Sequence, residues 1–255
     1  MILLYLIVFV FVQVSLSARI DGYKSYKNYK IYEVEGDKYG MGKIMQYLHD
    51  NYELPYHTVR GDNKCEMLIA PELVPILENM VQAAGLTAKV VVDDYSEIIK
   101  IEKSNPLRGG GFSWTAYHDI DAIYGYLQNM SKSHPETAQL VVGGQSYEGR
   151  QILGLRINSP TRNTKPVMFI ESGIHAREWI TPATTTYFIN ELLTSEDPKI
   201  QNLRNNFDWH IFPSVNPDGY HYSFTRDRMW RKTRSRSTSR CYGADPNRNW
   251  DYNWL

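Results

Sequence analysis

The sequence predicts two consecutive units, a small α+β unit followed by an α/β unit with a mixed sheet and helices on both faces. Three observations predict this. Residues 18–108 carry strand and helix patterns in the order β-α-β-β-α-β. Residues 105–111 contain a proline and three glycines, which is typical of a linker. Beyond the linker, strands and helices interleave, as they do in layered α/β domains.

Composition excludes several classes of protein. The 255 residues include 28 Lys+Arg and 28 Asp+Glu, so the formal net charge is zero and a general polyanion binder is disfavoured. With 42% hydrophobic and 22% charged residues, the chain is not wholly disordered. Its two cysteines form no C-x-x-C pair, which argues against a disulfide scaffold and a thiol-rich zinc site.

The amino terminus has the pattern of a secretory signal peptide. Residues 2–12 are continuously apolar, and small residues follow at Ser15, Ser17 and Ala18. The apolar run is shorter than the roughly 20 residues that span a bilayer. We therefore expect residues 1–17 to direct secretion and the mature protein to have no stable membrane association. No Lys or Arg precedes the run, and an uncleaved signal anchor is the alternative.

The first unit begins with alternating apolar residues over 30–35 and helical spacing over 40–51. Strands, a helix, another strand and a more polar helix follow at residues 56–59, 65–70, 71–84, 88–92 and 93–104. The β-α-β-β-α-β order is the ferredoxin-like arrangement.

The linker at residues 105–111 contains Arg108 between Pro106 and the glycines. Such a segment is exposed and flexible, and is a good target for proteases. An ordinary interdomain connection is the plain alternative.

The second unit continues to the end of the chain, over residues 109–255. A first helix is expected at residues 117–131. Strands, two helices and a last strand follow at residues 138–142, 152–157, 167–171, 182–193, 198–205 and 208–214. A basic run at residues 226–240 reads as a solvated loop, and a nucleic-acid site there is disfavoured.

Two candidate metal ligands, His175 and Glu178, lie between a buried strand and a helix start. Loops beyond the carboxyl ends of strands bind ligands in open α/β sheets. An imidazole and a carboxylate suit zinc, and catalytic zinc usually has three protein ligands and an open position. Because an isolated H-x-x-E pattern is weak, a purely structural helix start is the alternative.

Further polar residues occur together near the end of the chain. Asp245 can contact the His175 imidazole without binding the metal itself, and can thereby fix the tautomer of the ring. Arg248 presents a fork suited to a carboxylate, and Asn247 adds a neutral donor. The segment at 216–220 is expected to be a structural tight turn.

Taken together, these motifs resemble those of the zinc metallocarboxypeptidases of the pancreatic carboxypeptidase A and B type. The matching segments, in chain order, are 175–179 (HAREW), 216–220 (NPDGY), 230–234 (WRKTR) and 247–250 (NRNW). That family is secreted as a proenzyme with a ferredoxin-like activation domain, so the resemblance extends over residues 19–255. It implies an activation propeptide at 18–108, cleaved by an activating endoprotease after Arg108.

The resemblance also implies roles for individual residues. His175 and Glu178 are the expected ligands of one zinc ion, and Arg231 is expected to stabilise the oxyanion. Substrate contacts are expected from Arg177, Asn247 and Arg248, the last two holding the terminal carboxylate of peptides and proteins. Such a clamp positions the last peptide bond over the metal.

Other parts of the family site have no match in the 255 residues. The family's third zinc ligand, its active-site Tyr and its catalytic Glu lie further along the chain, so we expect an incomplete catalytic domain without peptidase activity of its own. His210 lies within a predicted strand and is expected to be structural. A non-catalytic binding or inhibitory isoform is the alternative to an enzyme.

Overall fold

The computed structural model describes residues 19–20, 22–52, 57–61, 63–104, 111–159, 164–236 and 241–252. The expected signal peptide at 1–17 and the expected cleavage position at Arg108 lie outside these ranges. Within them, no helix is both long enough and apolar enough to cross a bilayer.

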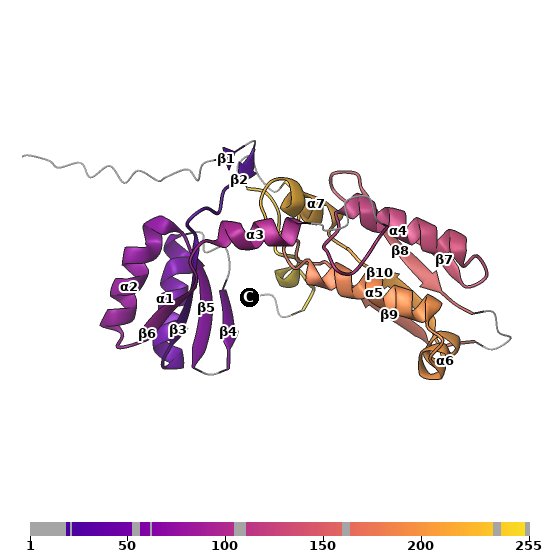
Figure 1. The fold of residues 1–255 in the computed structure, drawn as a ribbon, viewed down its shortest axis with the longest axis horizontal. Coiled ribbons are helices and arrows are strands. Elements are labelled where there is room, and N and C mark those ends of the chain that lie inside the picture. Colours follow the sequence, from indigo (N-terminus) through magenta and orange to yellow (C-terminus); the bar gives the residue numbers. More distant parts are fainter. Residues whose placement is uncertain are drawn as a thin grey trace, which may run out of the picture.

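The N-terminal unit (residues 19–104) contains a four-stranded antiparallel sheet with two helices on one face (Figure 1). The order along the chain is β-α-β-β-α-β, and the sheet order is β4-β5-β3-β6. The elements are β3 (Lys30–Glu35), α1 (Lys38–Asn51), β4 (His57–Arg60), β5 (Lys64–Ile69), α2 (Val74–Ala83) and β6 (Thr87–Val92).

Alternation of side chains explains the two faces of this sheet. Tyr32 and Val34 of β3 point into the core, which α1 and α2 complete. Glu33 points to the opposite face, where it pairs with Lys64 at 3.5 Å and Lys89 at 2.8 Å. The helices therefore bury one face, and ion pairs cover the other.

Two further elements connect this sheet to the rest of the molecule. Helix α3 (Tyr95–Lys103) leads from the sheet toward α7 (Figure 1). A short hairpin of β1 (Arg19–Ile20) and β2 (Tyr23–Lys24) lies against the same region, where the Lys24 amide donates to the Arg226 carbonyl at 2.7 Å. The sequence predicted α3 but not the hairpin.

The C-terminal unit (residues 111–252) has a mixed four-stranded sheet in the order β7-β8-β10-β9. Only β9 and β10 are parallel, and the other pairs are antiparallel. The elements are α4 (Ile120–Ser133), β7 (Ala138–Gln145), β8 (Gln151–Ile157), β9 (Val167–Glu171), α5 (Ile180–Thr194), α6 (Pro198–Asn206), β10 (Asp208–Phe212) and α7 (Pro217–Thr225).

The core of the C-terminal unit lies on one side of this sheet. Leu155 of β8 and Ile211 of β10 pack against Leu127 of α4 and Ile189 of α5. On the other side, Phe169 of β9 is 63% exposed. The expected helices thus cover one face only among the described residues, so the expectation of helices on both faces was wrong for this part of the chain.

The segment at 216–220 is also different from its prediction. It is the first turn of helix α7, not an isolated tight turn. Asn216 is the N-cap, and its side chain accepts from the Gly219 amide at 3.1 Å. Asparagine followed by proline suits a helix start as well as a turn, because proline is favoured at the first helical position.

Candidate active site

The segment that contains the two candidate ligands follows the carboxyl end of β9. Gly173 has φ +66°, and a Cβ there would lie 3.1 Å from the Pro213 carbonyl and from Ser214. Only glycine fits this close crossing of the segment that follows β10 without strain. The 175–179 loop therefore emerges at the edge where the parallel strands β9 and β10 both end.

His175 is 6% exposed and has a carboxylate next to each ring nitrogen. Its Nδ1 atom lies 3.0 Å from Oε1 of Glu178, and its Nε2 atom lies 3.2 Å from Oδ1 of Asp245. The structure thus brings together the three residues that the sequence predicted to cooperate.

The pair His175 and Glu178 fits a zinc ion. Zinc binds imidazole nitrogen and carboxylate oxygen at about 2.0–2.2 Å, which places two tetrahedral ligands about 3.4 Å apart. The observed 3.0 Å separation needs only a small adjustment. Within the described ranges, no group of three or more His, Cys, Asp and Glu side chains could hold a metal.

Arg231 contacts both carboxylates. Its Nε atom donates to Oδ2 of Asp245 at 3.0 Å, and its Nη1 atom lies 3.5 Å from Oε1 of Glu178. Burial alone would raise the pKa of Asp245, but hydrogen bonds from Arg231 and from the Asn247 amide lower it below the usual value. Asp245 therefore remains ionised between the imidazole and the guanidinium.

The predicted substrate-binding residues lie along one cleft. The turn at Pro246–Arg248 begins at Asp245 and leaves Asn247 and Arg248 exposed. A cleft of about 850 Å³ is lined by Arg177, Arg231, Asp245 and Arg248 from the C-terminal unit. Its opposite wall comes from the N-terminal unit and includes Tyr26, Met45 and His49. Asn247 is not among the lining residues.

The expectation that residues 226–240 form a solvated basic loop was partly wrong. Arg228 is 5% exposed and pairs with Glu102, while Arg234 lies 3.7 Å from the ring centre of Tyr222 and 3.5 Å from Glu148. Several of these side chains thus have separate structural partners, which the spacing of charges along the chain does not reveal.

His210 is consistent with its expected structural role. It lies in β10, with Nε2 3.4 Å from Oδ1 of Asp208, and the same carboxylate accepts two hydrogen bonds from Arg156.

Comparison with known proteins identifies the family of this chain. A family model described as zinc carboxypeptidase matches residues 123–255. The chain belongs to the zinc carboxypeptidase family. The match includes the 175–179 loop, Arg231 and the Asp245–Arg248 segment.

Curated relatives extend the similarity to the N-terminal unit. The chain is 35% identical to zinc carboxypeptidase A 1 of Anopheles gambiae over 249 residues, which are 94% of this chain and 57% of the relative. It is 54% identical to zinc carboxypeptidase of Simulium vittatum over 140 residues, which are 54% of this chain and 45% of the relative. The chain therefore spans about half of the length of these relatives.

Solved structures show the same architecture. The crystal structure of thrombin activatable fibrinolysis inhibitor matches with a TM-score of 0.77 and 27% identity, covering 89% of this chain and 59% of that one. Carboxypeptidase A from Helicoverpa armigera matches with a TM-score of 0.74 and 31% identity, covering 90% and 59%. The mixed α/β carboxypeptidase-like fold is thus shared over most of the described chain.

Proposed function

We propose that the chain provides part of the active site of a secreted zinc metallocarboxypeptidase, made as a proenzyme, which hydrolyses the C-terminal peptide bond of peptides and proteins. One observation carries the proposal: a buried imidazole lies between two carboxylates, one of them held by an arginine, beside a cleft lined by further arginines.

His175 and Glu178 would hold the metal. The chemistry that zinc supplies in such a site is polarisation of a carbonyl and activation of a water molecule. If Nδ1 held the metal, Nε2 would carry the ring proton and donate a hydrogen bond to Asp245, which would keep the ring in one tautomer and orientation.

The arginines would bind and orient the peptide. Arg248, assisted by Asn247, would pair with the terminal carboxylate, which restricts cleavage to the last peptide bond. Arg231, next to the metal ligand Glu178, would donate to the oxygen that becomes negatively charged in the transition state. Arg177 lines the same cleft and would contact the adjoining part of the peptide.

We also propose that residues 18–108 are an activation propeptide with the ferredoxin-like arrangement. The docked N-terminal unit forms one wall of the cleft in front of Arg231 and Arg248, where it would restrict access of large substrates. An endoprotease that cuts after Arg108 would separate the two units, and the sequence at 1–17 would direct the proenzyme to secretion.

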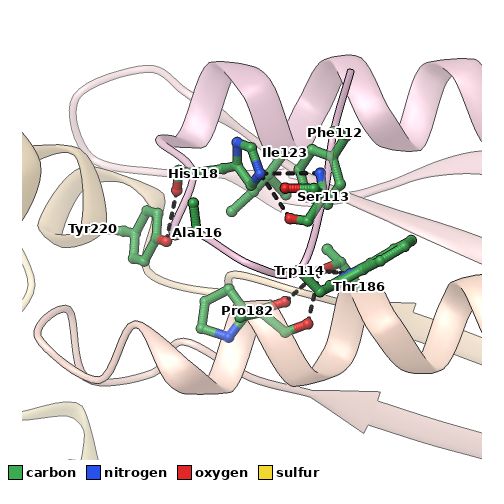
Figure 2. A pocket seen from close by; sticks show the side chains of 10 residues that line it. Phe112, Ser113, Trp114, Ala116, His118, Ile123, Pro182, Thr186 and Tyr220 are labelled. Atoms are coloured by element: carbon green, nitrogen blue, oxygen red, sulfur yellow. Dashed lines mark hydrogen bonds between the residues drawn. The ribbon is translucent and has the colours of Figure 1, made fainter. Parts of the chain in front are cut away.

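The segment that follows the linker is firmly attached to the C-terminal unit (Figure 2). The Trp114 indole donates to Thr186 at 3.2 Å, and the Tyr220 hydroxyl donates to the His118 carbonyl at 2.8 Å. The cavity between them, about 10 Å³, is about the size of one water molecule. After a cut following Arg108, residues 111–118 would lie near the new amino terminus of the catalytic part. These contacts would keep them packed against the rest of that part.

The test uses the polypeptide encoded by the complete transcript, treated with trypsin. We expect one zinc per molecule and chelator-sensitive release of C-terminal residues from peptides. The His175→Ala variant is expected to lose both, whereas His134→Ala, at the end of α4 away from the cleft, is expected to keep both. An active protein that contains no metal and is indifferent to chelators contradicts the proposal.

A further inference from the structure

The 175–179 loop has little regular structure and depends on contacts from a second segment, residues 223–231. The Ala176 amide donates to the Arg231 carbonyl at 3.1 Å, and the Ala176 carbonyl lies 3.1 Å from the Ser223 hydroxyl. The next carbonyl, that of Arg177, accepts from Nη1 of Arg228 at 2.8 Å. The peptide groups directly before Glu178 are thus held from outside the loop.

Arg228 is itself fixed in place. Its side chain is 6% exposed, and its guanidinium carbon lies 3.7 Å from the ring centre of Trp179, the last residue of the loop. Trp179 stacks on Phe224 at 3.8 Å and donates to Ser223 at 2.8 Å. The loop and the 223–231 segment therefore pack as one body around the Arg228 guanidinium.

The remaining donors of Arg228 bind a carboxylate from the other unit. Nε and Nη2 donate to the two oxygens of Glu102, in α3, at 2.7 and 3.0 Å. Two parallel hydrogen bonds fix the plane of a guanidinium as well as neutralising its charge. Removal of this carboxylate would leave an unpaired positive charge in a buried position, which is strongly unfavourable. The Arg228 side chain would then have to move toward water.

Other contacts at this interface involve residues of the same segment that precede Arg228. The Tyr26 hydroxyl donates to Asp227 at 2.6 Å, and Lys103 donates to the Phe224 carbonyl at 3.1 Å. Residues that precede Arg228 in the chain thus also touch the N-terminal unit, and Arg228 itself joins that unit to the Arg177 carbonyl of the 175–179 loop.

We propose that Arg228 is a positioning residue for the 175–179 loop, and that Glu102 of the N-terminal unit holds Arg228 in the orientation that positions it. Insofar as it concerns metal binding, this inference rests on the proposed function. The docked N-terminal unit then favours the loop conformation that binds zinc, and by reciprocity zinc favours docking. Metal loading is thereby promoted before the N-terminal unit is released.

The first experiment measures amide hydrogen exchange in the 255-residue chain without added metal. We expect Glu102→Gln to accelerate exchange of the Ala176 and Glu178 amides by about tenfold, the effect of losing a charge-assisted hydrogen bond. Arg228→Met is expected to do the same, and Arg228→Lys, which keeps the charge without the fork, to have an intermediate effect. Glu97→Gln, on the same helix in an exposed pair with Lys100, is the matched control.

The second experiment introduces the same substitutions into the polypeptide encoded by the complete transcript and measures zinc affinity by competition with a chromophoric chelator. We expect Glu102→Gln to weaken binding by about tenfold and Glu97→Gln to leave it unchanged. A wild-type chain that binds no zinc would argue against the proposed metal site, while the exchange data would still decide the positioning role.

Two results would overturn the inference. One is a Glu102→Gln variant whose loop amides exchange at the same rate as those of the wild-type chain. The other is equal acceleration at Ile211, in the buried strand β10, because Glu102 would then stabilise the whole fold instead of the loop. If the Glu102→Gln variant bound zinc as tightly as the wild-type protein, docking of the N-terminal unit would not be linked to metal binding.

Discussion

The Nε2 atom of His175 lies 3.2 Å from Oδ1 of Asp245, although the two residues are 70 positions apart in the chain. The same carboxylate accepts from Nε of Arg231 through its other oxygen, at 3.0 Å. One side chain therefore orients both the candidate metal ligand and the candidate oxyanion-stabilising arginine.

The Asp245→Asn substitution tests this shared role. An amide has no negative charge to bind Arg231 and presents only one oxygen. We expect zinc affinity to fall by about 10- to 100-fold, as for other residues that support a ligand histidine. Competition with a chelator measures the change, and Asp251→Asn, which is exposed near the same turn, serves as control. Unchanged affinity in Asp245→Asn would show that the contact does not orient His175 for metal binding.

Arg231 is expected to act on the transition state more than on substrate binding. In the complete, activated protein, Arg231→Ala should lower kcat by about 10²- to 10³-fold with a much smaller change in KM. Steady-state kinetics with a short peptide measure both. Lys199→Ala, at an exposed position of α6 that does not line the cleft, is the control. A loss confined to KM would assign Arg231 to ground-state binding.

Local patterns predicted most of the fold because each depends on residues close in sequence. Strands β3 and β9 have the bounds expected from alternation and from a short apolar run. Helix α7 was missed because its Asn-Pro start also suits a turn, and the deciding contacts come from elsewhere. One of them is the Tyr220 hydroxyl, which donates to a carbonyl 102 residues away.

Part of the candidate site was also predictable from the sequence. The proximity of His175 and Glu178 follows from their spacing of three residues, and their likeness to a known motif indicated zinc. Arg228 was missed because it lies in a run of basic residues that reads as surface. Its partner Glu102 is 126 positions away, so only the folded structure shows that this one arginine is buried.

Trp179 is expected to be essential for the stability of the C-terminal unit. It is 1% exposed, stacks on Phe224 and packs edge-to-face on Tyr117. Trp179→Ala should reduce the free energy of unfolding by about 3–5 kcal/mol. Chemical denaturation followed by circular dichroism measures this, and Trp250→Ala, at a 60% exposed position, should change it by less than about 0.5 kcal/mol. Similar effects of the two substitutions would contradict the packing argument.

Cleavage of the linker is expected to depend on Arg108. Trypsin should cut the folded chain first after this residue, because the nearby Lys103 lies in α3 and donates to the Phe224 carbonyl. Arg108→Gln should therefore slow the appearance of a fragment starting at residue 109, as followed by mass spectrometry. Equally fast cutting of the variant within residues 95–104 would show that α3 does not protect its own lysines.

The last prediction concerns acid stability. Asp208 accepts from Nε and Nη2 of Arg156 at 2.8 and 2.5 Å, and these bonds lower the pKa of Asp208 despite its burial. A carboxyl group with a lower pKa in the folded state stabilises the fold above its unfolded pKa, about 3.9. That contribution is lost as the pH falls through the folded pKa.

Asp208→Asn should therefore destabilise the C-terminal unit at pH 7, by about 1–2 kcal/mol since Arg156 is 39% exposed to screening solvent. The difference from wild type should shrink as the pH falls below about 4 and disappear once the wild-type carboxyl is protonated. Urea denaturation at several pH values measures it, with Glu136→Gln in the exposed turn after α4 as control. A difference that stays constant down to pH 2 would mean that the carboxylate acts by packing and not by its charge.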